Sequence, residues 1–563
     1  MFEASDEASL KLNPISALSR GDLRYADRLG DYLDDAYYDA ERRAAERELA
    51  ALARIDRASL TASELISYDV FKWQRELDLR GLQPDLLALT AVRPLDHFGG
   101  FHTRFAQISA GDSVAPFKTV ADYDNGLSRI DDFVKVMDRS IVRMRQGMAS
   151  GVVQPRLVMD NVVEQLDAML AQGVDGSSFM KPLAAFPAGI PAAEQARLKA
   201  AYTQSVATEL RPVLMRVRNF IVAEYLPKTR ASVGLGAMPG GDKLYAYLVE
   251  ASTTTNLTPD AIHGIGLSEV ARLHAEMEGV KRQVGFAGSL KEFFEHIRTD
   301  PKFKPTSREA LQQGYVAIGK RLDATLPKLF ATLPKSRLDI RPVPALTEKG
   351  AARGSYNSGT ADGSRPGVFY FNAYDLPSRT TPGMETLYLH EGAPGHHFQI
   401  SLAQENEALP KFQRFGGNTA YVEGWGLYAE TLGRELGVYT DPYQYFGYLD
   451  SQLFRAIRLV VDTGIHSKGW SREKTIQYIL DNSSRGLSNA TAETERYIAN
   501  PGQALSYKIG QLKISELRAR SEKALGRKFD IREFHSQVLM SGALPLSVLE
   551  AKVDAWVKAK KAR

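Results

Sequence analysis

The sequence contains no cysteine among its 563 residues. A chain without thiols cannot form disulfides, bind a metal through thiolate sulfur or use a cysteine nucleophile. It also has no uninterrupted apolar run that approaches the ~20 residues of a membrane-spanning helix. A basic stripe is missing too, because residues 552–563 alone account for the formal net charge of +4. We therefore predict no disulfide scaffold, no membrane span and no nucleic-acid partner.

The first residues, MFEASDEAS, lack the basic and apolar regions of a secretory signal peptide. Such a start fits either a cytoplasmic protein or a mature exported form in which Met1 replaces a removed leader. The complete avoidance of cysteine favours the exported form. We therefore expect a periplasmic or otherwise exported mature form, with a cytoplasmic protein as the alternative.

Hydrophobic residues at 44% and charged residues at 25% are typical of a soluble globular protein. Apolar residues recur with the helical period in several long segments. These segments are Ala121–Gly147, Leu157–Gln172, Ala193–Glu224, Thr258–Val284, Ser307–Thr332 and Asp530–Ala559. Short runs rich in β-branched and aromatic residues predict strands at Ile340–Leu346 and Gly367–Asn372. The sequence thus predicts a mostly helical protein with one small β-sheet.

Three of the ten histidines fall within eight residues, at His390, His396 and His397. The pair His390-Glu391 begins like the zinc-peptidase pattern H-E-x-x-H, but Pro394 occupies the place of the second histidine. On a straight helix His396 would point away from His390, and His397 would lie two turns along the axis. Pro394 disfavours a straight helix, and a widened turn would bring His396 to the missing ligand position. The alternative is an ordinary Pro-Gly helix end with surface histidines.

The segment Asn418–Gly433 offers a third metal ligand. Glu423 and Glu430 lie seven residues apart on one face of the predicted helix. Gly424 and Gly426 follow Glu423 closely, and their missing side chains would permit a close approach of another helix. A carboxylate among apolar neighbours is costly unless it binds something, which favours Glu423 as the ligand over Glu430. The alternative is a solvated glutamate on a helix weakened by glycine.

Four motifs carry a resemblance to a known family. They are HEGAPGHH at 390–397, EGWGLYAE at 423–430, DTGIH at 462–466 and PGQALSYKIG at 501–510. In their order they closely resemble the bacterial family called domain of unknown function 885, and the likeness extends over almost the whole chain. Members look like distant relatives of the helical zinc peptidases typified by thimet oligopeptidase, neurolysin and angiotensin-converting enzyme.

The resemblance implies a two-lobed helical ellipsoid with a central channel and one small sheet next to the metal-binding helix. Residues 1–250 would form a helical lobe and residues 251–563 a catalytic lobe, within one continuous fold. It also implies one zinc ion per chain, held by His390, His396 and Glu423, with Glu391 as the general base. His397 remains an alternative second ligand, and Glu430 an alternative third.

Two further groups are candidates to stabilise the oxyanion, because related peptidases use a tyrosine and a histidine there. They are Tyr507 and His466, for which a core tyrosine and a helix-end histidine are the alternatives. Several cationic side chains are candidates to hold a substrate carboxylate, with surface salt bridging as the competing interpretation. These side chains are Arg365, Arg455, Arg458 and Lys508. The strand Gly367–Asn372, with Tyr370, is expected to present its edge to an extended peptide.

We therefore predict a helical zinc metallopeptidase that acts on peptides or oligopeptides. A zinc hydrolase of some non-peptide amide or ester is a second hypothesis. A zinc-binding module without catalysis is a third, and the presence of Glu391 beside His390 argues against it because a structural zinc site needs no base. The sequence does not predict an oligomeric state.

Overall fold

The computed structural model describes residues 1–111, 113–344, 348 and 352–562. This part of the chain is mostly helical and contains one three-stranded sheet, so the predicted fold class is confirmed. None of its helices is both long enough and apolar enough to cross a membrane. The chain forms two compact units. The first comprises Met1–Ile55, Gln74–Tyr245 and Ile498–Asn500, and the second comprises Asp56–Trp73, Ala246–Tyr497 and Pro501–Arg563.

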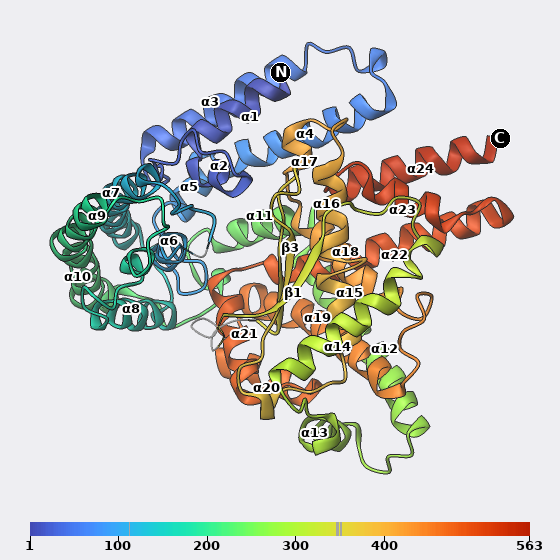
Figure 1. Ribbon diagram of the computed structural model, residues 1–563. Coiled ribbons are helices and arrows are strands. Elements are labelled where there is room, and N and C mark those ends of the chain that lie inside the picture. The colour runs from blue at the N-terminus through green and yellow to red at the C-terminus, as the bar shows by residue number, and fades with distance from the viewer. Residues whose placement is uncertain (112, 345–347, 349–351, 563) are drawn as a thin grey trace. The chain divides into compact units, whose positions relative to one another are not determined.

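All the regular elements in the described residues of the first unit are helices (Figure 1). Two of its helices, α4 and α11, continue into the second unit. The α-helices are α1 (Phe2–Leu12), α2 (Pro14–Arg20), α3 (Asp35–Leu52), α4 (Ala62–Gly81), α5 (Pro84–Thr90), α6 (Phe101–Ser109), α7 (Val120–Ser150), α8 (Arg156–Ala171), α9 (Ala192–Ser205), α10 (Arg211–Phe220) and α11 (Gly241–Thr253).

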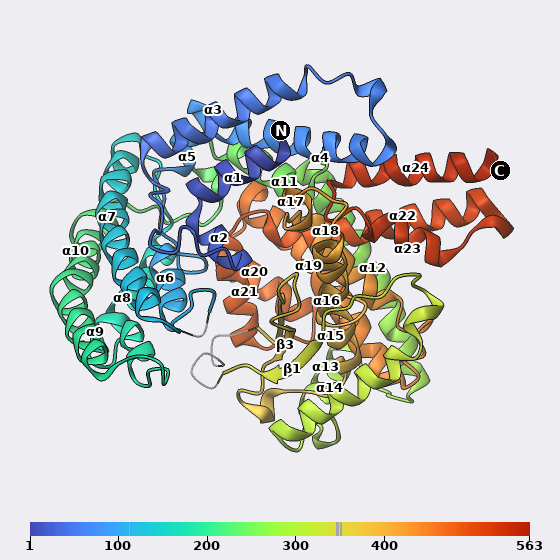
Figure 2. The same cartoon turned by 45° about the horizontal axis from the view of Figure 1, so that its top comes forward.

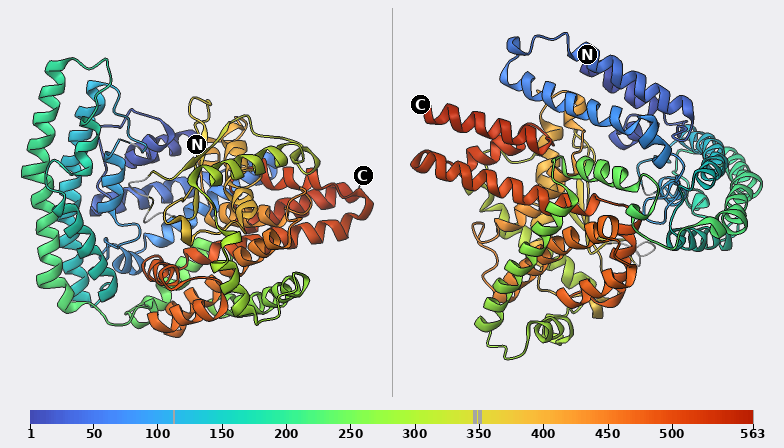
Figure 3. Two further views of the ribbon diagram at one scale, coloured as in Figure 1. Left: turned by 60° about the horizontal axis from the view of Figure 1, so that its bottom comes forward. Right: turned by 180° about the vertical axis from the view of Figure 1, so that it is seen from behind.

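The longest helices of the first unit follow the predicted apolar spacing. Helix α7 begins with a reciprocal capping box between Thr119 and Asp122 and buries Ile130, Phe133 and Met137 on one face. Helices α9 and α10 join through a π-helical segment at Val206–Leu210 into one rod, which Figure 3 shows in green beside α7. The predicted helix at 193–224 is therefore one continuous helical stretch.

The second unit holds the remaining helices and the sheet (Figure 2). Only the end of α21 belongs to the first unit. The helices are α12 (Pro259–Gln283), α13 (Leu290–Thr299), α14 (Arg308–Asp323), α15 (Met384–Glu391), α16 (His396–Glu405), α17 (Lys411–Arg414), α18 (Thr419–Thr431), α19 (Pro442–Lys468), α20 (Arg472–Asn482), α21 (Leu487–Ala499), α22 (Ser506–Leu525), α23 (Ile531–Leu539) and α24 (Leu546–Ala562). The predicted helix at 530–559 is thus two helices.

The strand order in the sheet overturns one expectation. Strands β1 (Leu338–Pro342), β2 (Gly354–Asn357) and β3 (Gly367–Phe371) are arranged β1-β3-β2, with β1 parallel and β2 antiparallel to β3. The predicted edge strand at 367–372 is therefore the central strand, and the prediction that its edge receives a peptide is wrong because β1 and β2 pair with both of its edges. The predicted strand at 340–346 overlaps β1, but Leu346 lies outside the described residues.

The sheet packs closely on the helix that ends at the histidine cluster. Phe369 and Phe371 of β3 are buried and contact Tyr315 of α14, with ring centroids 5.0 and 5.4 Å apart. Phe369 also meets Tyr388 of α15 at a centroid distance of 6.2 Å. Helix α15 in turn contacts α14, α18 and α19 (Figure 2). The end of α15 is thus held from several sides.

Helices α18 and α22 approach one another unusually closely. A Cβ atom on Gly424 would lie 2.5 Å from the Cα of Gly510, and one on Gly510 would overlap the carbonyl oxygen of Ala420. Because such distances exclude any side chain, only glycine lets the two backbones meet here. The predicted close approach at Gly424 is confirmed, and it places the glutamates of α18 beside the first turn of α22.

Candidate metal centre

The two histidines lie on either side of a helix break. Helix α15 ends at Glu391, and α16 begins at His396. The loop between them includes a cis peptide bond between Ala393 and Pro394. The indole nitrogen of Trp425, on α18, donates to the carbonyl of Pro394 at 2.7 Å and so fixes the loop. The chain therefore breaks at the proline as expected, but it reverses through a loop instead of the widened helical turn that the sequence suggested.

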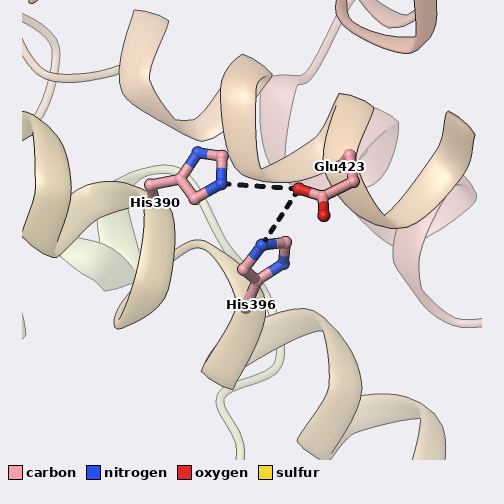
Figure 4. Close-up of side chains that lie close together, drawn as sticks. All are labelled: His390, His396 and Glu423. Atoms are coloured by element: carbon pink, nitrogen blue, oxygen red, sulfur yellow. Dashed lines mark ion pairs between the residues drawn. The ribbon is translucent and has the colours of Figure 1, made fainter. Parts of the chain in front are cut away.

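His390, His396 and Glu423 converge at this break (Figure 4). One ligand atom from each residue lies within 4.8 Å of the other two. Glu423 Oε2 is 3.6 Å from His390 Nε2 and 3.4 Å from His396 Nε2, and neither contact completes a hydrogen bond for this oxygen. Three donor atoms therefore face one another across distances that suit a shared cation better than direct hydrogen bonds.

Gly426 makes room for the two imidazole rings. A Cβ atom at this position would lie 2.9 Å from His390 Cε1 and 3.1 Å from His396 Cε1. Helix α18 thus presents bare backbone to the rings while Glu423, almost one turn earlier, supplies the carboxylate. Both glycines were predicted to permit the close approach of another helix. Gly424 serves that contact with α22, whereas Gly426 makes room for the two imidazole rings.

The electrostatics of the three groups call for positive charge. Burial alone would raise the pKa of Glu423, but the two imidazoles lower it well below its ordinary value. Burial alone would lower the pKa of His390, but Glu423 and Glu430 raise it to about 9. A carboxylate and two imidazoles in a buried place thus offer three ligand atoms to one cation. Their donor chemistry, two nitrogens and one oxygen, fits zinc.

Glu430 lies behind the first ligand, away from the cluster. Its Oε1 is 2.9 Å from His390 Nδ1, and its side chain is fully buried. Ser451 and the amide of Gln452 donate to the same carboxylate at 3.2 and 3.0 Å. A carboxylate bonded to the outer nitrogen of a histidine fixes the ring and leaves its other nitrogen free to bind a metal. This placement favours Glu430 as a positioning residue over a ligand.

Lys508 extends this network. Its ammonium group is completely buried, 3.0 Å from Gln452 Oε1 and 2.9 Å from Glu269 Oε2. By holding the oxygen of the Gln452 amide, Lys508 turns the amide nitrogen toward Glu430. These contacts favour a structural role for Lys508, and a substrate contact for this residue stays a prediction.

We expect Glu430→Gln to weaken metal binding without unfolding the protein. The substitution keeps the shape of the side chain but removes the charge that orients His390, which typically costs ~10–100-fold in metal affinity. Competition with a chromophoric zinc chelator measures the change. Glu435→Gln is the matched control, because Glu435 is exposed and pairs with Arg518. Unchanged affinity in Glu430→Gln would contradict the assigned role.

His397 turns away from the cluster toward the sheet. Its Nδ1 lies 3.1 Å from the hydroxyl of Tyr356 on β2, and a Cβ on Gly367 would lie 2.8 Å from the same nitrogen. Burial lowers the pKa of His397 to about 4, so the ring is neutral at neutral pH. These contacts favour His396 as the second ligand and give His397 a structural role between α16 and the sheet.

Glu391 and Tyr507 lie near the cluster. Glu391 is buried at the end of α15, and its charge adds to those that raise the pKa of His390. Tyr507 is half-buried in the first turn of α22, with the guanidinium of Arg458 4.5 Å from the centre of its ring. Burial raises the pKa of Tyr507, and the charge of Glu423 raises it further. The phenol is thus within electrostatic range of a ligand.

The other predicted side chains are placed differently. His466 is buried in α19, with its Nε2 2.9 Å from the carbonyl oxygen of Tyr497, which favours a structural role. Arg365 is exposed in the connection between β2 and β3. Tyr370 is half-buried on β3, and its side chain points to the face opposite Phe369 and Phe371. A substrate contact for Arg365 or Tyr370 stays a prediction.

Sequence reasoning missed the residues behind His390. Ser451 and Gln452 lie on α19 and Glu269 on α12, far from the histidine motif in the sequence. Spacing offers one signal, because Ser451, Arg455 and Arg458 follow one another at intervals of four and three residues on one helical face. Contacts between residues on different helices, such as those behind His390, leave no such pattern in the sequence.

The comparisons with known proteins identify the family. A family model described as "Bacterial protein of unknown function (DUF885)" matches residues 14–553. The chain therefore belongs to the DUF885 family. A search of curated proteins found no match.

Two solved structures share the fold along nearly their whole length. One, a candidate lipoprotein from Colwellia psychrerythraea, has 27% identity and a TM-score of 0.91, and the match covers 99% of this chain and 98% of that one. The other, a candidate lipoprotein of unknown function from Shewanella oneidensis, has 19% identity and a TM-score of 0.74, with 98% of both chains covered. The second likeness shows the fold alone.

Proposed function

We propose that the protein is a single-zinc metallopeptidase that hydrolyses peptides or oligopeptides. The observation that carries the proposal is the convergence of His390, His396 and Glu423, with a buried carboxylate behind the first histidine. Two imidazoles and one carboxylate are a ligand set of catalytic zinc sites, which leave a further position for water or substrate. Bound zinc would supply a Lewis acid that polarises a carbonyl and lowers the pKa of water to ~7.

Glu391 is the proposed general base. It directly follows His390 and is buried at the same helix end. In peptide hydrolysis the carboxylate would accept the proton of the attacking water and later deliver it to the nitrogen of the leaving amine. The C–N bond breaks, the carbonyl carbon gains the hydroxyl group, and Glu391 returns to its starting state.

Tyr507 is the proposed donor to the developing oxyanion. We expect Tyr507→Phe to lower kcat by roughly 10²–10³-fold, as for the loss of one oxyanion donor. KM should change little, because the hydrogen bond strengthens only in the transition state. Steady-state kinetics on a cleaved peptide measure both constants. A structural tyrosine would instead give a lower Tm with kcat nearly intact.

An extended peptide would need an outer strand of the sheet, and we assign this role to β2. In the sheet of the described residues, β2 is an outer strand that pairs with β3 along one of its edges. Tyr356 of β2 contacts His397, the residue after the proposed ligand His396. A peptide added along β2 would gain main-chain hydrogen bonds next to the metal centre.

Metal analysis combined with peptide digestion tests the proposed function. Dialysed protein should contain about one zinc per chain, and a chelator should abolish cleavage of a peptide library until zinc is restored. Protein that binds no metal and that zinc cannot activate would overturn the proposal. Cleavage of esters or non-peptide amides alone would favour the second hypothesis.

We also propose an exported location. The Colwellia and Shewanella proteins that share the fold are described as candidate lipoproteins, and the chain avoids cysteine. Fractionation of the native cells with an antibody against the protein tests this location.

A further inference from the structure

A cluster of three arginines in the second unit has more donors than partners. Arg455 and Arg458 lie one turn apart on α19, and Arg485 precedes α21. Their side chains are 16%, 7% and 11% exposed. Each carries a buried nitrogen without a hydrogen-bond partner among the described residues: Arg455 Nε, Arg458 Nη1 and Arg485 Nε. A buried donor left without an acceptor is costly, so three of them together indicate a missing acceptor.

The carboxylates nearby do not balance this cluster. Glu493 is 3.2 Å from Arg458, but it also pairs with Arg496 at 3.1 Å. Arg485 is 3.3 Å from Asp450, which also accepts from the hydroxyl of Ser484. The charge that remains near these groups is positive, since one of the two carboxylates serves two guanidinium groups.

Arg455 has the most distant carboxylate partner of the three, although its Nη1 donates to the hydroxyl of Ser451 at 2.7 Å. The nearest carboxylate that it reaches is Glu430, at 4.0 Å, and Glu430 is already bonded to His390, Ser451 and Gln452. Burial lowers the pKa of Arg455, and repulsion from Arg458 and Arg485 adds to this effect. An anion bound here would relieve both the lack of acceptors and the repulsion.

The arginine cluster adjoins the metal centre. The guanidinium of Arg458 lies 4.5 Å from the ring centre of Tyr507. Arg455 lies 4.0 Å from Glu430, the carboxylate that is bonded to His390. Phe454 connects the cluster internally, because the guanidinium groups of Arg458 and Arg485 lie 5.0 and 4.4 Å from its ring centre. A substrate group bound at these arginines would belong to the same molecule that reaches Tyr507.

We infer that Arg455, Arg458 and Arg485 bind the α-carboxylate of the peptide substrate, so that the enzyme is an exopeptidase acting from the C-terminus. This inference rests on the proposed peptidase function. Guanidinium groups suit a carboxylate ligand because their planar arrangement of N–H donors pairs with both of its oxygens. Hydrolysis then adds water across a peptide bond near the C-terminus and releases a short fragment that ends in the bound carboxylate.

The test compares one peptide sequence in three forms. The first form has a free C-terminal acid, the second has a C-terminal amide, and the third has the amide with a glutamate as the last side chain. Wild-type protein should cleave the acid with a kcat/KM ~10–100-fold above that of the amide, the size expected for charge-assisted hydrogen bonds. The amide with glutamate should resemble the plain amide, because the site recognises the main-chain carboxylate.

Substitution of the cluster should remove this discrimination. Arg485→Gln should lower kcat/KM for the acid ~10–100-fold while leaving the amide almost unchanged, so that the ratio falls toward one. Arg455→Lys, which keeps the charge but loses Nε, is the second variant in case Arg485→Gln does not fold. Arg472→Gln is the matched control, because Arg472 pairs with Glu495 at 2.6 Å and should keep the full ratio.

A binding measurement separates the two levels of the proposal. Calorimetry on zinc-loaded Glu391→Gln protein should show tighter binding of the acid than of the amide, and Arg485→Gln in that background should remove the difference. Equal cleavage of acid and amide by wild-type protein would overturn the inference and leave the peptidase proposal standing. Cleavage of the amide with glutamate as fast as the acid would show that the cluster binds an acidic side chain, and would overturn the C-terminal assignment. If zinc-loaded protein cleaves no peptide at all, the proposed function itself is wrong.

Discussion

Replacing Glu391 by glutamine is expected to reduce kcat by ~10²–10⁴-fold, the contribution typical of a general base. Glutamine has the same shape but cannot accept the proton of the attacking water. Glu391 is not one of the three residues whose ligand atoms converge. The variant should therefore still bind one zinc ion and unfold at the Tm of the wild-type protein. Steady-state kinetics, elemental analysis and thermal unfolding on the same preparation measure the three quantities.

A second glutamate of the same region serves as the control. Glu405→Gln should retain kcat, because Glu405 lies at the end of α16 and accepts from the main-chain nitrogens of Lys335 and Ser336. Near-normal turnover by Glu391→Gln with zinc still bound would show that another group is the base.

His396→Ala is expected to abolish stable zinc binding, while His397→Ala should retain it. Removing a ligand should cost more than the ~10–100-fold that follows loss of a residue behind a ligand. His397→Ala should instead lower stability by ~1–3 kcal/mol, because it removes a buried ring together with its hydrogen bond to Tyr356. Zinc content after dialysis and denaturant unfolding give the two readouts.

The two variants are each other's control, since the residues are adjacent and both are buried. A reversed result, with zinc lost from His397→Ala and kept by His396→Ala, would contradict the ligand set. Loss of zinc from both variants would mean that α16 as a whole is required, and Glu423→Gln would then test the centre independently of that helix.

Local rules predicted much of the fold and the core of the centre. Helical periodicity located the long helices because their apolar faces are continuous, as in α7. The incompatibility of Pro394 with a straight helix showed that His390 and His396 need not point apart. The cost of an unpaired buried carboxylate pointed to Glu423. Each of these arguments uses only neighbouring residues and elementary energetics.

Other features depended on contacts that no local pattern encodes. The pairing of β3 on both edges requires β2, whose four residues include a glycine and an asparagine and carry little strand signal. Lys508 looked available to a substrate because nothing in its own segment reveals Glu269 on α12. Glu430 remained an alternative ligand because its seven-residue spacing from Glu423 puts both on one helical face, yet its carboxylate is bonded to the outer nitrogen of His390.

The glycine contact between α18 and α22 has a consequence for the proposed active centre. Glu423 precedes Gly424 by one residue, and Tyr507 precedes Gly510 by three. Because the two backbones touch at these glycines, a contact of main chain against main chain, without an adjustable side chain, sets the separation between Glu423 and Tyr507. A single methyl group added at Gly510 would push the two helices apart. It would thereby move the phenol of Tyr507 relative to the carboxylate of Glu423, although both side chains remain. The distance between the two groups of the proposed active centre thus depends on two glycines that have no functional side chain.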